Sequence, residues 1–188
     1  MSERLQRDPN LPLDERAFRA RSRELWTQAA AVTRDIQAPP VCRVDLSGSN
    51  QTITVTTLTT LSLLKSSSYA IDTHGWFDES TNRYTPQRSG YYHVDLAMTL
   101  SKSTLDLVGY VIGRILKNGA SQAQLYWQTL PASAIVAPLT LAQIVYCDGV
   151  ADYLTFAIEY QSSTGLVVDG NAVRTYAAIH YLGDKQAS

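Results

Sequence analysis

The fold is decided by one stretch, which reads WFDESTNRYTPQRSG over residues 76–90 and continues as YYHVDLAMTL over residues 91–100. In its second half, apolar side chains alternate with polar or small ones. The apolar positions are Tyr92, Val94, Leu96, Met98 and Leu100. A period of two over about ten residues predicts a β-strand with one face in a core. The first half places Asp, Ser, Asn, Pro and Gly between aromatic residues, which is typical of turns.

This stretch also resembles the signature of C1q-like globular heads: an aromatic residue and Asp, then Asn-x-Tyr, then Pro-x-x-x-Gly-x-Tyr and an alternating strand. The matching residues are Phe77, Asp78, Asn82, Tyr84, Gly90 and Tyr92. A further match is the Lys-Asn-Gly turn of that family, here Lys117, Asn118 and Gly119. Asn-Gly between strand-like runs predicts a tight hairpin even without the resemblance. The family's usual Phe-x-Gly in the closing strand is absent, and Ala177 and Ala178 stand in its place.

The resemblance covers about residues 41–183. It implies a ten-stranded jelly roll of the C1q/TNF superfamily, whose heads work as trimers. On this basis we expect the motif residues in the core or at a subunit interface; they are Phe77, Asn82, Tyr84, Gly90, Tyr92, Asn118 and Gly119. Independently, runs rich in Thr, Val, Ile and Leu with turn signals about every 8–12 residues predict a β-sandwich or barrel. These runs include residues 51–64, 123–129 and 173–182. We therefore predict a mainly β, antiparallel jelly-roll β-sandwich with an N-terminal α-helix, assembled as a homotrimer.

The composition fits one domain with an appendage. The chain has 188 residues, and a head of about 145 residues buries a substantial core without disulfides. A net charge of −1 gives no bulk reason to bind nucleic acid or an anionic membrane. The two cysteines, Cys42 and Cys147, lack ligand-like spacing, and we expect two buried free thiols rather than a disulfide. The N-terminus is charged from Glu3 onward and no apolar run reaches about 18 residues, so neither a secretory signal nor membrane insertion is expected.

The first 40 residues have a different character. We predict an extended docking leader over residues 1–12, a helical stalk over residues 13–40 that ends at Pro39-Pro40, and the head over residues 41–188. Apolar residues recur every seven positions, with a companion row four residues further on. The predicted stalk positions are Phe18, Ser22, Leu25, Ala29, Val32 and Ile36. This spacing predicts either a trimeric coiled coil or an amphipathic helix packed on its own head. Arginines on the helix alternate with acidic residues, which indicates a solvated face of mixed sign more than a nucleic-acid site.

The sequence carries no recognisable catalytic constellation. His74, His93 and His180 are the only histidines, and none lies in a nucleophile-elbow, His-Glu-x-x-His or phosphate-loop context. Asp72-Thr73-His74 imitates a general-base pair that nothing nearby completes. Acidic residues in predicted turns allow two readings, plain turn formers or the calcium-binding loops of some C1q-like heads; they are Asp78, Glu79, Asp148, Asp152 and Asp169. We expect no enzyme activity, no cofactor and no metal.

Several aromatic residues lie outside the predicted apolar rows: Tyr91, Tyr110, Tyr126, Trp127, Tyr146, Tyr153 and Tyr176. They are consistent with a subunit interface or with ordinary sandwich packing.

The whole chain most resembles the C1q-like knobs of bacteriophage virion proteins, which assemble in the bacterial cytoplasm. We predict a non-enzymatic, homotrimeric phage tail fibre or spike. Its knob would bind a host-surface glycan or protein, or a neighbouring virion protein, and residues 1–40 would attach to other virion proteins. The predicted attachment residues are Pro9, Leu11, Pro12, Phe18 and Leu25. The alternatives are a capsid-decorating trimer that stabilises the shell and a carbohydrate-active jelly-roll enzyme.

Overall fold

A computed structural model describes residues 13–37, 39–54, 57–102, 109–127, 136–162 and 166–184. The chain divides into two compact units, Met1–Pro39 and Pro40–Ser188. The predicted docking leader, with Pro9, Leu11 and Pro12, lies outside the described residues. So do the side chains of Val32 and Ile36, although their backbone is helical.

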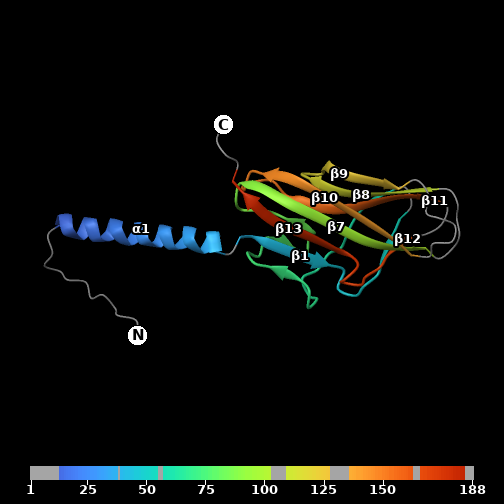
Figure 1. Cartoon of the computed structure of the whole chain (residues 1–188), viewed down its shortest axis with the longest axis horizontal. Helices are drawn as coiled ribbons and strands as arrows, with labels where there is room; N and C mark the ends of the chain where they lie inside the picture. The colour runs from blue at the N-terminus through green and yellow to red at the C-terminus, as the bar shows by residue number, and fades with distance from the viewer. Residues whose placement is uncertain are drawn as a thin grey trace. The chain divides into compact units, whose positions relative to one another are not determined.

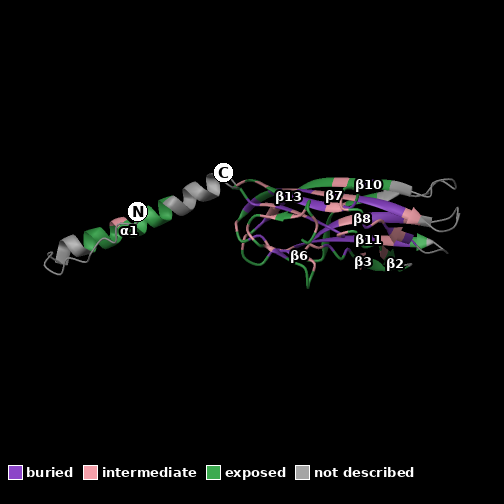
Figure 2. Cartoon of the chain, turned by 90° about the horizontal axis from the view of Figure 1, so that it is seen from below, coloured by how far each residue is buried: buried purple, intermediate pink, exposed green. Residues whose placement is uncertain are grey.

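The first unit contains one helix, α1 (Leu13–Gln37), as the sequence predicts. It ends just before Pro39-Pro40, because proline has no N–H to donate and clashes with the preceding turn of a helix. Its described turns are almost entirely exposed (Figure 2). Phe18, Leu25 and Trp26 are 72%, 57% and 77% exposed, so α1 by itself leaves large apolar side chains uncovered. No helix among the described residues has the length and apolar character needed to cross a bilayer.

The second unit, the head, is built from two antiparallel β-sheets (Figure 1). The β7 sheet has the order β2-β12-β7-β13-β1-β4, with β10 also paired to β7. Its strands are β1 (Val41–Asp45), β2 (Gln51–Ile53), β4 (Ile71–Asp72), β7 (Gly90–Lys102), β10 (Val136–Cys147), β12 (Leu166–Val168) and β13 (Tyr176–Gly183). The β8 sheet has the order β5-β6-β11-β8-β9, with β3 paired to β11. Its strands are β3 (Leu58–Thr60), β5 (Phe77–Asp78), β6 (Arg83–Tyr84), β8 (Gly109–Lys117), β9 (Ala120–Trp127) and β11 (Leu154–Ser162).

Three predicted runs have different bounds in the structure. Residues 51–64 form two strands in different sheets: β2 pairs with β12, whereas β3 pairs with β11. The return strand of the hairpin begins at Ala120, directly after the Asn118-Gly119 turn. The closing strand begins at Tyr176, because the amides of Arg174 and Thr175 both donate to the Asn171 carbonyl at 2.9 Å and form a turn instead.

The core lies between the two sheets, and the alternation predicted for residues 91–100 is confirmed. Tyr92, Val94, Leu96, Met98 and Leu100 of β7 are all buried. The buried row that faces them from the β8 sheet lies on β11 and consists of Leu154, Phe156, Ile158 and Tyr160. Each fully buried side chain of this kind contributes about 1.5–3 kcal/mol relative to an exposed one, so these two strands supply much of the driving force for folding.

Both cysteines are buried and free, as predicted. Burial raises the pKa of the Cys42 thiol and of the Cys147 thiol to about 12. Because the thiolate is the reactive form, both groups are chemically inert near neutral pH.

Aromatic residues of the stretch 76–90 pack against β7. Asp72 accepts hydrogen bonds from the amides of Trp76 (3.2 Å) and Phe77 (3.0 Å), which shapes the entry to β5. The ring centroid of Tyr84 lies 6.2 Å from that of Tyr92, and the Tyr92 hydroxyl donates to the Arg88 carbonyl at 2.7 Å. The motif aromatics are therefore core residues.

Asn82, Asn118 and Gly119 are turn residues, whereas Gly90 is the first residue of β7. Asn82, Asn118 and Gly119 have φ angles of 53°, 53° and 80°, the left-handed conformation that Asn and Gly tolerate. Gly90 has a φ of 148° and lies directly against the Gly183 carbonyl.

Candidate subunit interface

The outward side of the β7 sheet carries an unusual mixture of side chains for a solvent-facing surface. Strand register brings together residues from five strands. We call this set the β7 face: Arg43, Ile71, Tyr91, His93, Asp95, Ile144, Tyr146, Tyr176, Ala178 and His180. In the register, Ile144 lies opposite His93, His93 opposite His180, and Asp95 opposite Ala178. Arg43 lies opposite both Ala178 and Ile71.

One part of the β7 face is apolar and aromatic. The rings of Tyr91 and Tyr146 meet edge-on with centroids 5.5 Å apart, and the Tyr146 hydroxyl lies 3.1 Å from the Ser89 hydroxyl. Ile144 follows on the same side of β10 and is 55% exposed. An isoleucine of this exposure beside two tyrosines makes this part of the β7 face a candidate for contact with a partner.

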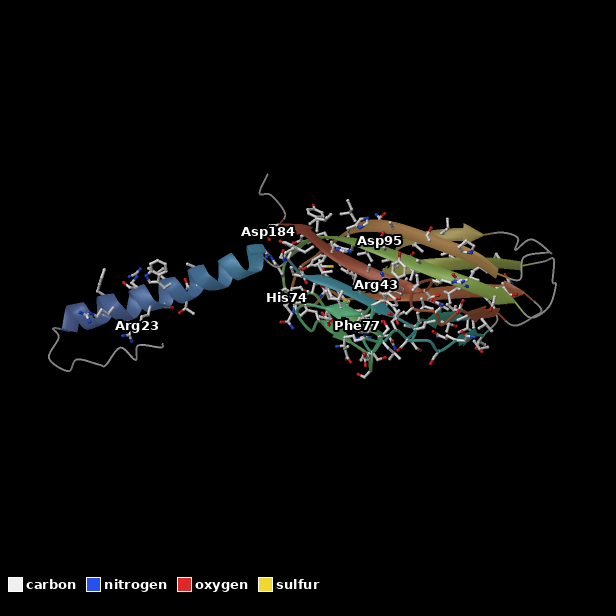
Figure 3. All side chains as sticks on the ribbon, turned by 60° about the horizontal axis from the view of Figure 1, so that its bottom comes forward. Arg23, Arg43, His74, Phe77, Asp95 and Asp184 are labelled. Atoms are coloured by element: carbon white, nitrogen blue, oxygen red, sulfur yellow. The ribbon has the colours of Figure 1, made fainter. Side chains whose placement is uncertain are left out.

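The middle of the β7 face is polar. His93 Nδ1 lies 3.2 Å from Asp95 Oδ2, and His180 is exposed on the neighbouring strand. Figure 3 shows Asp95 and Arg43 on the ribbon of this sheet. The imidazole and carboxylate supply directional hydrogen-bonding groups at the centre of this surface.

The other part of the β7 face is organised by Arg43. Its guanidinium carbon lies 4.1 Å from the Tyr176 ring centroid and 5.8 Å from that of Tyr69. One terminal nitrogen donates to the Ala172 carbonyl at 3.1 Å, while Nε is buried without a hydrogen-bond partner among the described residues. The Tyr176 ring and the Ala172 carbonyl hold the Arg43 guanidinium at this end of the β7 face.

The acidic turns have structural partners of their own. The Asp78 carboxylate accepts from the Ser80 and Thr81 hydroxyls at 2.7 and 2.9 Å, and these bonds lower its pKa. Asp148 Oδ1 accepts from the amides of residues 150, 151 and 152 at 2.9–3.0 Å. Within the described residues there is no group of three or more His, Cys, Asp or Glu side chains placed to hold a metal ion. Asp78 and Asp148 therefore act as turn formers, because their carboxylates accept hydrogen bonds from residues of their own turns.

Asp152 ties the predicted hairpin to the loop between β10 and β11. Its carboxylate accepts from Lys117 Nζ at 2.7 Å, from the Asn118 side-chain amide at 2.6 Å and from the Asp148 amide at 2.8 Å. The Asn118 side chain accepts in turn from the Tyr153 amide at 2.9 Å. Desolvation raises the pKa of Asp152, but the bonds from Lys117, Asn118 and Asp148 outweigh it, and the net pKa is lowered.

We expect the substitution Asp152→Asn to destabilise the head by about 2–3 kcal/mol near neutral pH, because Lys117 loses its buried counter-charge. A carboxyl group whose pKa is lower in the folded chain than in the unfolded chain stabilises the fold at pH values above its unfolded-state pKa. This stabilisation is lost as the pH falls through the folded-state pKa. The wild type should therefore lose stability below about pH 4, and the variant should lose less over that range. Urea unfolding at several pH values measures both effects. The control is Asp169→Asn, whose ion pair with Arg174 is longer, at 3.6 Å, and more exposed, so it should contribute less than about 1 kcal/mol. Equal losses in the two variants would contradict the prediction.

The histidines do not form a catalytic pair. In Asp72-Thr73-His74, the Asp72 carboxylate is occupied by backbone amides, and His74 Nδ1 instead lies 2.8 Å from the Thr73 hydroxyl. His93 and His180 lie opposite the apolar rows, as predicted, and both belong to the β7 face.

The predicted site residues fall into separate groups. Phe18, Ser22, Leu25 and Ala29 lie on α1, while the motif residues are core or turn positions of the head. Among the predicted surface aromatics, Tyr91, Tyr146 and Tyr176 belong to the β7 face. Tyr110 lies on the other sheet, where its hydroxyl is 3.3 Å from Glu159 Oε1, and the Arg83 guanidinium stacks on Tyr153 at 4.1 Å. The side chains of Tyr126 and Trp127 lie outside the described residues.

Sequence reasoning missed Ile144, Arg43 and Ile71 as surface residues. A signal for Ile144 was present. In residues 139–147, the row that contains Leu139, Leu141, Val145 and Cys147 already predicts the core face, so an isoleucine and a tyrosine in the opposite row indicate a second covered face.

No family model and no curated protein matches this chain. Solved structures do. The Eiger TNF protein of S. frugiperda aligns with a TM-score of 0.52 at 9% identity, over 80% of this chain and 97% of that one. Murine APRIL, solved at pH 5.0, aligns with a TM-score of 0.53 at 12% identity, over 76% of this chain and 98% of that one. The head has a TNF-like jelly-roll fold. This confirms the predicted fold class, and the likeness at these identities is one of fold alone.

Proposed function

We propose that the chain is a non-enzymatic virion structural protein, a homotrimeric phage tail fibre or spike whose TNF-like knob binds the host surface or a neighbouring virion protein. The observation that carries the trimer is the β7 face, where exposed Ile144 lies between paired tyrosines and a polar centre. The heads that the sequence resembles work as trimers, and a second copy is a partner whose chemistry suits this surface.

The stalk supports the same assembly. The seven-residue recurrence on α1 coincides with exposed Phe18 and Leu25, which the same stripe of a second copy would cover. Two prolines separate α1 from β1. A helix of 25 residues is about 38 Å long, enough to hold the knob away from an attachment point formed by residues 1–40.

The virion role is inferred from the combination of parts. A jelly-roll head with C1q-like motifs, a proline-linked helical stripe and two free buried thiols resembles phage knobs that assemble in the bacterial cytoplasm. Their binding relies on shape and loops rather than on covalent chemistry. Both thiols are inert, and the Asp72 carboxylate is occupied by backbone amides rather than by His74, which supports a binding role.

Two measurements test this proposal. Sedimentation of the full chain should give a mass of about 62 kDa, three times 20.7 kDa. Gold-labelled antibodies to residues 41–188 should then mark the tail of phage particles that carry the gene, seen by electron microscopy. Label spread over the capsid would favour a decoration protein instead. A single-chain mass, or unlabelled particles, would overturn the proposal.

A further inference from the structure

The helix α1 places two unlike side chains on opposite flanks of its apolar stripe. Successive residues of a helix are about 100° apart, so Phe18, Ser22, Leu25 and Ala29 lie within a sector of about 60°. On the same wheel, Trp26 lies about 70° to one side of the middle of the stripe and Arg21 about 70° to the other. Both are exposed, and Trp26 is the most exposed of the three large apolar residues on the helix.

Trp26 has no counterpart in the seven-residue recurrence. An indole exposed to 77% lies beside a stripe in which the two members nearest to it, Ser22 and Ala29, are small. Small residues in the stripe let helices approach closely, and a close approach brings flanking side chains of adjacent helices into contact. The stripe therefore predicts that contacts at its flanks decide how copies of α1 pair.

We infer that Trp26 of each chain stacks on Arg21 of a neighbouring copy, in a parallel, in-register three-helix stalk. This inference rests on the proposed homotrimer and deepens it. With Phe18 and Leu25 at d positions and Ser22 and Ala29 at a positions, Arg21 is a g residue and Trp26 the e residue five positions later. In parallel coiled coils, those two positions face each other across the helix pair.

The chemistry of the pair is complementary. A guanidinium stacks on the face of an indole through cation–π attraction, and Trp is the best aromatic partner for it. In a threefold-symmetric stalk, Trp26 of each helix contacts Arg21 of one neighbour, and its Arg21 contacts Trp26 of the other neighbour. The three Arg21–Trp26 contacts are therefore equivalent and form together. In an antiparallel pair, e positions face e positions and g positions face g positions, and this contact is lost. The Arg21–Trp26 contact therefore selects the parallel arrangement.

The test compares four variants of the full chain: R21E, W26K, R21E/W26K and R23E. Arg23, visible in Figure 3, is the matched control, because it is exposed and lies about 130° from the middle of the stripe, yet its substitution makes the same change in charge. The readouts are thermal melting of the helical circular dichroism signal and sedimentation. Trp26 emission is a third readout, isolated by subtracting a W26F variant because the chain has two other tryptophans.

We expect R21E and W26K each to lower the melting temperature of the stalk by several degrees, and R21E to shift Trp26 emission to longer wavelength. R23E should leave the melting temperature and the Trp26 emission unchanged. The double variant R21E/W26K again places opposite charges at the facing positions, so it should regain part of the lost melting temperature, and high salt should remove that gain.

The outcomes separate this inference from the proposed function. A chain that sediments at 20.7 kDa at all concentrations overturns the homotrimer itself. A homotrimer in which R21E melts like R23E, or in which the double variant regains nothing, keeps the proposed function and overturns the Arg21–Trp26 contact. Nucleic acid that copurifies with the wild type but not with R21E or R23E would assign these arginines to a nucleic-acid partner and would overturn the contact as well.

Discussion

Replacing Gly90 by alanine is expected to destabilise the head by about 3–5 kcal/mol, because the added methyl group meets backbone that cannot retreat. A Cβ at this position would lie 2.5 Å from the Gly183 carbonyl oxygen and 2.6 Å from Cε2 of Tyr181. The φ of 148° at Gly90 adds strain for any residue with a side chain.

Neither neighbour of Gly90 is free to move. Gly183 pairs with Tyr91 just beyond an irregularity in the β13–β7 register, so a shift of its carbonyl would disturb the end of that ladder. The Tyr181 ring packs edge-on to Tyr92 at 5.2 Å, and the Arg88 guanidinium covers it at 4.4 Å. The clash therefore reaches a buried residue of β7, the central strand of its sheet.

Denaturant unfolding of the purified chain measures this loss. The control is Gly119→Ala, because Gly119 also has a positive φ, of 80°, but a Cβ there meets nothing within 4 Å. That variant should lose only about 1 kcal/mol from backbone strain. Equal losses in the two variants would show that steric contact at Gly90 is unimportant. Since small domains are stable by only about 5–15 kcal/mol, the Gly90 variant should also express poorly.

Replacing Ile144 by aspartate is expected to dissociate the trimer into folded single chains. Ile144 is 55% exposed in one chain, so the substitution leaves the core intact. If the β7 face is covered by a second copy, each trimer would bury three unpaired carboxylates near Asp95. A buried unpaired charge costs several kcal/mol, so the trimer dissociation constant should rise by at least about a thousandfold.

Sedimentation across a dilution series measures this effect, and far-UV circular dichroism checks that the fold is retained. The matched control is Leu58→Asp on β3, in the other sheet, where Leu58 is 46% exposed. That variant should keep the mass of the wild type. If the Ile144 variant remains a trimer, the subunits meet through another surface. If both variants dissociate, the assembly depends on both sheets and the interface is not confined to the β7 face.

Local chemistry was sufficient to predict a large part of this protein. Alternation in residues 91–100 predicts β7 and its buried row, since side chains of a strand point to opposite sides in turn. Asn118-Gly119 predicts the β8–β9 hairpin because both residues accept positive φ, and Pro39-Pro40 predicts the end of α1 because proline cannot continue a helix. Each of these features depends on a few neighbouring residues.

Long-range pairing had to be seen in the structure. Residues 51–64 look like one strand-rich run, yet β2 and β3 belong to different sheets. The β7 face is assembled by the register of β10 and β13 on the two sides of β7, which brings Ile144, His93 and His180 into one row. Periodicity predicts which side of a strand is buried but not which distant strand lies beside it, because that choice depends on how the whole core packs. The residues proposed to bind a second copy of the head therefore come together only once the sheets are formed.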